Sequence, residues 1–171
     1  YYNDKPDGIR REYNEEGAII KGYIFNNGIL LADGITDHKG LRQGHWKEYY
    51  ESGELLAEGD YNNSIKVGIW KYYHRNGKIE QQGEYDSRGR AVNEWNWYYS
   101  SGNILRTETF EANIQEGEVL EYSDSGSVIV RGQYEDGEET GKWTYIIGDV
   151  IEEGNYEAGT PVGIWTQRDS D

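Results

Sequence analysis

The sequence contains no cysteine and no methionine among its 171 residues. Without thiols the chain can form neither a disulfide nor a thiolate metal site. It also lacks both a signal-peptide pattern and an apolar run of about 18 residues, so we predict no membrane insertion. Because no initiator methionine is present, we expect a processed product or a fragment of a longer protein.

Basic residues are also few, since 17 Lys and Arg stand against 32 Asp and Glu, for a net charge of −15. Such a chain repels phosphate groups, which disfavours nucleic acids and anionic membranes as partners. The three histidines, His38, His45 and His74, lie at unrelated positions, so no metal site is predicted. No glycine loop precedes a helix, and no spacing supports a catalytic triad. We therefore predict no enzyme and no small-molecule cofactor.

Aromatic residues and glycine are abundant instead. The chain has 16 Tyr, 6 Trp and 23 Gly, although only 35% of its residues are hydrophobic. A disordered acidic chain would be poor in aromatics, so disorder is the weaker interpretation. Thin sheets that bury amphipathic aromatic side chains on partly wet faces fit this composition better.

The sequence repeats itself with a period of about 24 residues. The segment 44–61 and the segment 68–85 carry Gly, Trp, Tyr, Gly, Gly and Tyr at matching places. Further copies occupy 93–110, 117–134 and 141–156, the last being shortened near Gly148, and a degenerate copy begins at Gly8. Each copy reads as two strands joined by a glycine turn, and helix periodicity is absent.

Counting from the turn glycine predicts which side chains share a face. The second residue after it is aliphatic, the eighth is aromatic, and the sixth is glycine in four copies. These even offsets predict one common face, with a large ring from the neighbouring strand lying over the sixth-position glycine. Trp and Tyr stand seven and four residues before the turn glycine, as in Trp46 and Tyr49. This odd spacing leaves two alternatives, aromatics on both faces or an intervening bulge.

The motif Gly-x-Trp-x-x-Tyr-Tyr-x-x-Gly, followed by Gly-x-Tyr, resembles the MORN repeat in its bacterial variant form. It is similar to the YwqK-type antitoxin family of Bacteroidota. The resemblance implies an all-β fold, an elongated single-layer antiparallel β-meander of about six tandem hairpin repeats. It also implies a non-catalytic module for protein contact or membrane association. The chain departs from the pattern at Arg10 and Val119, where Trp is expected.

The domain organisation follows from the repeats. We predict one array over 1–171, with an irregular junction at 26–43, regular repeats at 44–162 and an incomplete repeat at 163–171. The junction contains one additional strand, Ile29 to Ile35. Connections between repeats, such as the segment 62–68, are expected to be longer and charged loops.

Positions that carry the same type of residue in the copies are expected to stabilise the sheet. They are Trp46, Trp70, Trp95, Trp143, Gly59, Gly83, Gly132, Gly154, Tyr61, Tyr85, Phe110, Tyr134 and Tyr156. Large side chains that occur only in the central copies are candidates for binding, because exposed Tyr and Trp concentrate at interaction surfaces. They are Tyr50, Tyr72, His74, Trp97 and Tyr99. The alternative is that these aromatics only cover the centre of the sheet.

Three function classes remain open from the sequence. The first is a non-catalytic repeat scaffold that mediates protein–protein interaction. The second is a glycan-binding module whose flat rings stack on sugars. The third is a structural spacer, and the second and third would suit a bacterial cell-envelope or secreted protein. A protein partner is the leading expectation.

Overall fold

The structure, a computed structural model, describes residues 4–169. These residues form strands and turns without any helix, which confirms the all-β prediction. No helix in the described part of the chain could therefore span a membrane. The chain divides into two compact units, unit 1 ending at Arg90 and unit 2 beginning at Ala91. Residues 170–171 of the predicted incomplete repeat lie outside the described residues.

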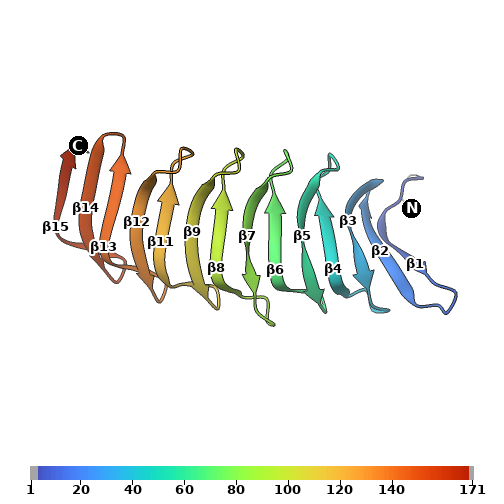
Figure 1. Cartoon of the computed structure of the whole chain (residues 1–171). Helices are drawn as coiled ribbons and strands as arrows, with labels where there is room; N and C mark the ends of the chain where they lie inside the picture. The colour runs from blue at the N-terminus through green and yellow to red at the C-terminus, as the bar shows by residue number, and fades with distance from the viewer. Residues whose placement is uncertain (1–3, 170–171) are drawn as a thin grey trace. The chain divides into compact units, whose positions relative to one another are not determined.

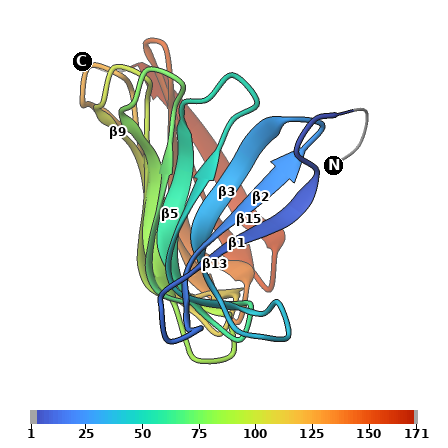
Figure 2. The same ribbon diagram turned by 90° about the vertical axis from the view of Figure 1, so that its right-hand side faces the viewer.

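The strands of unit 1 follow one another in chain order as an antiparallel meander (Figure 1). They are β1 Gly8–Tyr13, β2 Ile19–Asn26, β3 Ile29–Thr36, β4 Arg42–Tyr49, β5 Leu55–Asn62, β6 Ile65–Tyr73 and β7 Ile79–Tyr85. The additional strand predicted in the junction is β3. Within this unit β1 to β3 are inclined with respect to β5, as expected for a twisted sheet (Figure 2).

The strands of unit 2 are also antiparallel and in chain order, with β9 pairing with both β10 and β11. They are β8 Ala91–Tyr98, β9 Ile104–Glu111, β10 Ile114–Gln115, β11 Gly117–Tyr122, β12 Val128–Glu135, β13 Glu138–Ile147, β14 Val150–Glu157 and β15 Thr160–Asp169. In each unit the sheet is a single layer, because the described residues contain no helix or second sheet to cover it.

Three core tryptophans, Trp46, Trp70 and Trp143, lie between glycines on the two neighbouring strands. Trp70 on β6 pairs in register with Gly83 on β7, and its ring lies over Gly59 on β5. A Cβ atom on Gly59 would overlap that ring, and Gly34, Gly132 and Gly154 stand in the same relation to Trp46, Trp143 and Trp165. Trp46 and Trp70 have no exposed surface, and Trp95 and Trp143 are buried too. A ring over the sixth-position glycine was predicted and is confirmed at Gly59, Gly132 and Gly154.

The first glycine of the motif makes room for this contact. Between β5 and β6 the pairs Glu58–Lys71 and Asp60–Val67 leave one residue on β5 opposite three on β6. This bulge includes Gly68, whose φ of +66° lies in the left-handed region that favours glycine. The extra residues carry the Trp70 side chain over the preceding strand. Gly44, Gly141 and Gly163 have positive φ at the equivalent point, and Asn93 replaces them in one repeat.

Trp46 and Tyr49 lie on opposite faces of β4, because the Tyr49 hydroxyl bonds to Asp33, which pairs with Lys47 on the face opposite Trp46. We call the side of each sheet that carries the core tryptophans the Trp face and the other side the Tyr face. Trp46, Trp70, Trp95 and Trp143 mark the former, and Tyr49, Tyr73, Tyr98 and Tyr122 mark the latter. Both faces therefore carry aromatic residues, which was one of the two alternatives.

A second bulge corrects the prediction for the aliphatic residues. Glu48 pairs with Ala57 but Tyr49 pairs with Leu55, so Leu56 is an extra residue on β5. Leu55 consequently shares the Tyr face with Tyr49, while Leu56 packs against the core of the Trp face. The prediction that the second-position aliphatic shares a face with the sixth and eighth residues is wrong for Leu55, Ile79, Ile104 and Val128.

The degenerate first copy is turned over relative to the regular ones. Because β3 is one additional strand, the Gly17 turn lies at the sheet margin of the β3–β4 and β5–β6 turns, opposite the Gly53 turn (Figure 1). Tyr23 pairs with Asp33, whose carboxylate accepts a hydrogen bond from Tyr49 and so lies on the Tyr face. The ring of Phe25 contacts Tyr23, so Phe25 does not share a face with Tyr61 as its repeat position implied.

The connections between repeats are shorter than predicted. In place of a loop over 62–68, β5 and β6 are joined by Asn63 and Ser64 alone, with φ of +50° and +66°. Two successive residues with positive φ are typical of a hairpin turn whose twist matches the strands. The N–H of Ser64 donates to the carbonyl of Arg42 at 2.9 Å, which ties the turn to the preceding hairpin.

The two departures from the motif in unit 2 compensate each other. Glu108 takes the sixth position, where a glycine would admit a ring, and it is only 4% exposed. Val119, at the tryptophan position of the next repeat, is smaller and lies beside Glu108 in the register of β9 and β11. Arg106 and Gln115 donate hydrogen bonds to the Glu108 carboxylate at 3.1 and 2.6 Å. Glu108 thus fills the space that a glycine would leave, and Val119 replaces the tryptophan ring that would have occupied it.

We predict that Gly59→Ala lowers the free energy of unfolding by about 1–3 kcal/mol, because its methyl group would overlap the Trp70 ring. Urea denaturation measures the change, and Asn62→Ala, at the exposed end of the same strand, is the control with little expected effect. Equal stability of the Gly59→Ala variant and the parent chain would show that Trp70 does not need this gap.

Candidate binding surface

The five candidate binding residues occupy two kinds of position. Tyr72 and Trp97 lie on the Trp face of β6 and β8, in unit 1 and unit 2 respectively. Tyr50, His74 and Tyr99 are each the first residue of a five-residue turn, closed by a hydrogen bond such as that from the N–H of Tyr50 to the carbonyl of Glu54. The candidates therefore lie either on the Trp face of a strand or at the start of a turn.

Tyr72 belongs to the packed layer of unit 1. Its ring lies 6.1 Å from that of Trp70, and its hydroxyl is 3.0 Å from both Lys66 Nζ and the Tyr85 hydroxyl. Burial, followed by the hydrogen bond with Tyr85, raises the pKa of Tyr72. These contacts indicate that Tyr72 covers the centre of the sheet, and they favour that role over binding a partner.

Tyr50 and Tyr99 link successive repeats. The Tyr50 hydroxyl donates to the backbone carbonyl of Tyr73 at 2.8 Å, and the Tyr99 hydroxyl donates to that of Tyr122 at the same distance. The Arg75 guanidinium also lies 4.5 Å from the centre of the Tyr50 ring. Each of these tyrosines thereby ties its own turn to the next hairpin.

Trp97 is half-buried between Trp95 and Phe110, whose ring centroids are 6.2 and 6.4 Å away. It borders a hollow of about 320 Å³ with Leu105, Arg106, Glu108 and Glu121. Arg106 pairs with Glu121 at 2.5 Å and with Glu108 at 3.0 Å. The polar groups of this hollow are thus already paired with one another.

The Trp face of unit 1 holds two cations of the chain's own over its aromatic rings. The Arg42 guanidinium lies 4.8 Å from the Trp46 ring and 5.0 Å from the Tyr61 ring, and it pairs with Glu48 at 2.6 Å. Lys66 Nζ lies 4.0 Å from the Trp70 ring and 4.9 Å from the Tyr72 ring. Arg42 and Lys66 each stand four residues before the tryptophan that they cover.

An aromatic hollow of about 390 Å³ opens on the Trp face of β13 to β15 in unit 2. Its walls are formed by Tyr145, Tyr156 and Trp165, together with Ile147, Glu152 and Pro161. The Tyr145 and Trp165 rings stack at 6.2 Å, and Tyr156 meets Trp165 edge-on at 5.2 Å. Sequence reasoning missed this site, although comparison of the residues four before each tryptophan could have indicated it.

The Tyr face of unit 1 carries hydrogen bonds between tyrosines and carboxylates. The hydroxyls of Tyr49 and Tyr73 donate to Asp33 and Glu58, each at 2.6 Å. Burial, followed by the hydrogen bond with Glu58, raises the pKa of Tyr73 to about 12. The hydrogen bond from Tyr73 in turn holds the pKa of Glu58 below its ordinary value.

The histidines remain separate from one another. His38 lies in the β3–β4 turn, His74 in the β6–β7 turn, and His45 on β4, where it contacts Asp60 and Glu58 at 3.1 and 3.6 Å. Over residues 4–169, no group of three His, Asp or Glu side chains could hold a metal ion. That the chain binds no metal stays a prediction.

Comparison with known proteins identifies the repeat. The profile of the MORN repeat variant matches residues 42–63, 66–87, 92–112 and 115–136, just over half of the chain. No curated protein matches the sequence. A solved structure described as the GtfA/B complex bound to UDP and GlcNAc is similar at 14% identity and a TM-score of 0.29. That alignment covers 79% of this chain and 23% of the other, and a likeness this weak supports no functional argument.

We predict that Trp70→Ala lowers the free energy of unfolding by about 3–5 kcal/mol, because a fully buried ring is lost. Changing half-buried Tyr72 or Trp97 to Ala should lower the free energy of unfolding by less, and each variant should remain folded at 25 °C. Thermal and urea denaturation of the three variants rank them, with exposed Tyr13→Ala as the control. If Trp97→Ala costs as much as Trp70→Ala, Trp97 is a core residue with no spare surface for binding.

We also predict that Tyr73→Phe destabilises the chain more at pH 7 than at pH 3. The lowered pKa of Glu58 contributes stability above its unfolded value of about 4.3, and this is lost as pH falls through the folded pKa. Urea denaturation at both pH values measures the difference. Tyr13→Phe, at the same repeat position but exposed, is the matched control. A pH-independent loss for Tyr73→Phe would contradict the pairing with ionised Glu58.

Proposed function

Because the chain belongs to the MORN repeat variant family, we propose that it is a non-catalytic repeat scaffold that binds a protein partner. The family supports the repeat scaffold. The binding role and the partner are our inference from the surface.

One observation carries the proposal: each sheet is a single layer, and aromatic rings line a hollow on its Trp face. Tyr145, Tyr156 and Trp165 meet in that hollow on β13 to β15. Tyrosine and tryptophan contribute large contact areas at small entropic cost, which is why they are enriched at the energetic centres of interfaces. No described segment of unit 2 forms a second layer over this face.

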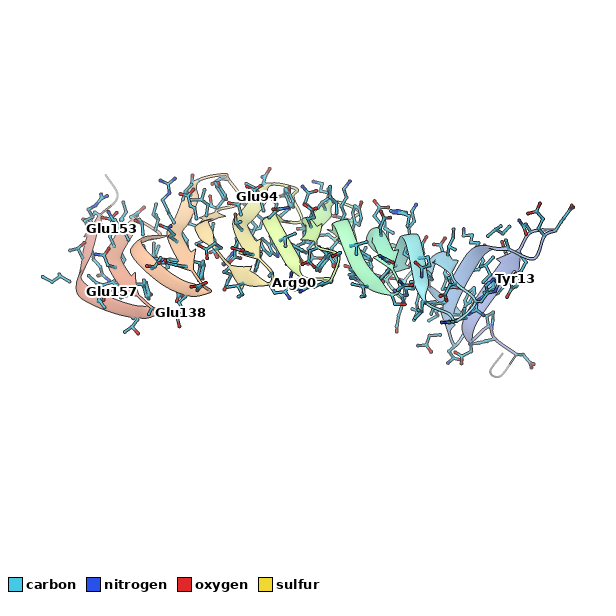
Figure 3. All side chains as sticks on the ribbon, turned by 90° about the horizontal axis from the view of Figure 1, so that it is seen from below. Tyr13, Arg90, Glu94, Glu138, Glu153 and Glu157 are labelled. Atoms are coloured by element: carbon cyan, nitrogen blue, oxygen red, sulfur yellow. The ribbon has the colours of Figure 1, made fainter. Side chains whose placement is uncertain are left out.

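The charge of the chain favours a basic partner. A net charge of −15 creates a negative potential that attracts basic surfaces and speeds their association. In unit 2 Glu138 on β13 and Glu157 on β14 are exposed (Figure 3). The same charge supports the proposal that nucleic acid is not a partner.

The absence of catalysis is part of the proposal. It is supported by the separation of the three histidines and by the paired state of Arg106, Glu108 and Glu121. Membership of the YwqK-type antitoxins, and a bacterial origin in Bacteroidota, are finer proposals that rest on the resemblance of the motif alone.

We would test the proposal with the whole chain immobilised against extracts and, in parallel, against a glycan array. We expect a captured protein that, once purified, binds the purified chain directly and loses affinity for a Trp165→Ala variant. Ile164→Ala is the control, because Ile164 neighbours Trp165 on β15 but is 85% exposed and points to the opposite face. Binding to glycans alone would replace the proposal with a glycan-binding module, and binding to neither would leave a structural spacer.

A further inference from the structure

The residue four before the tryptophan position varies along the array. From Trp46 onward it is Arg42, Lys66, Ala91, Gln115, Glu139 and Pro161. Only the first two are cations, and both lie over the aromatic rings of unit 1. The last of the six is Pro161, which borders the aromatic hollow of unit 2.

The surroundings of Pro161 reproduce those of Lys66. Tyr61 pairs with Lys66, and Tyr156 pairs with Pro161, in the same register of neighbouring strands. Tyr61 meets the Trp70 ring at 5.0 Å and an angle of 79°, while Tyr156 meets the Trp165 ring at 5.2 Å and 89°. Each tryptophan lies over a glycine of the preceding strand, Gly59 or Gly154. The two sites thus share their geometry but not their cation.

The site in unit 2 has one more aromatic wall. Tyr145 occupies the repeat position that Glu48 has in unit 1, two residues after the tryptophan position. Its ring stacks on Trp165 with an interplanar angle of 24°. Glu152 pairs with Tyr145 across β13 and β14 and borders the hollow. Within residues 4–169 Glu152 forms no ion pair, so its carboxylate remains available to a ligand.

We propose that the hollow between Tyr145, Tyr156 and Trp165 binds a lysine or arginine side chain of a protein partner. The cation would take the place that Lys66 has over Trp70, with Glu152 as its counter-ion. Aromatic faces attract cations electrostatically, most strongly where water is partly excluded. The inference rests on the proposed function and names the chemistry of the partner.

Charge complementarity favours this occupant over others. Glu152 would lose its hydration without compensation beneath an apolar side chain, and it would repel a carboxylate or a phosphate. Glu139 also acts on the site, since its charge is among the lesser causes, after burial and the hydrogen bond with Tyr156, that raise the pKa of Tyr145. A cation satisfies the aromatic faces and the carboxylates together.

The test uses the full chain labelled with ¹⁵N and an acetylated, amidated pentapeptide with one central lysine among glycines. Matched peptides carry norleucine or glutamate instead of lysine. We expect saturable shifts of the Trp165 indole resonance with the lysine peptide, with a Kd on the order of 1 mM for a single side chain. The norleucine and glutamate peptides should cause no saturable shift.

Two substitutions at Pro161 provide the sharpest comparison. Pro161→Lys installs the chain's own cation, as in Lys66, and should abolish binding of the lysine peptide while raising the melting temperature. Pro161→Gln removes the same ring without adding charge and should retain binding. Glu152→Gln should weaken binding several-fold. Each variant's amide spectrum shows whether β13 to β15 stay folded, so loss of binding is not confused with loss of structure.

The proposal is overturned if the lysine peptide leaves the Trp165 indole unshifted, or if Pro161→Lys binds as well as Pro161→Gln. Equal shifts with the norleucine peptide would instead identify an apolar site. The proposed function is judged separately: a purified protein partner that binds Pro161→Lys and the parent chain equally would preserve the scaffold and refute this site. A partner that loses affinity only for Pro161→Lys supports both.

Discussion

The contact on which the structure depends is a tryptophan ring lying over a glycine of the neighbouring strand. A single-layer sheet has no opposing layer in which to bury large side chains. Trp70 is nevertheless fully buried, because Gly59 on the preceding strand leaves the space that its ring fills. The core of each unit therefore lies within the layer, and each repeat provides the gap that its neighbour occupies.

The need for a gap beside each tryptophan explains both the regular repeats and the repeat that carries Val119 instead. The bulge at Gly68 exists because the ring must reach across to the preceding strand, and its positive φ requires a residue that tolerates the left-handed region. At Glu108 the gap is filled by a buried carboxylate that Arg106 and Gln115 hold. The next repeat accordingly carries Val119 where the other regular repeats carry tryptophan. A local change in one hairpin thus selects the side chain of the next.

The same layer creates the surface available for function. Rings that are buried edge to edge still present part of their faces, and in unit 1 those faces are covered by Arg42 and Lys66. At Trp165 the corresponding residue is Pro161, so the rings border an open hollow beside Glu152. A stabilising cation–π contact and a candidate binding site thus differ at one position of the repeat, which is Lys66 in unit 1 and Pro161 in unit 2. A cation of the chain itself over these rings would stabilise the fold but would block binding of a partner's cation at the same aromatic face.

The sequence by itself determined the repeat, the strands and the ring over the sixth-position glycine, because these depend on local spacing and on glycine's missing side chain. Only the tertiary structure decided which residues share a face. The bulge at Leu56 moves Leu55 to the Tyr face, and the additional strand β3 turns the first copy over, so Phe25 departs from Tyr61. It also divided the candidate binding residues between the Trp face and the turns, and it revealed the hollow around Trp165. Registers and bulges arise from pairing between strands, and a count along one strand does not contain that pairing.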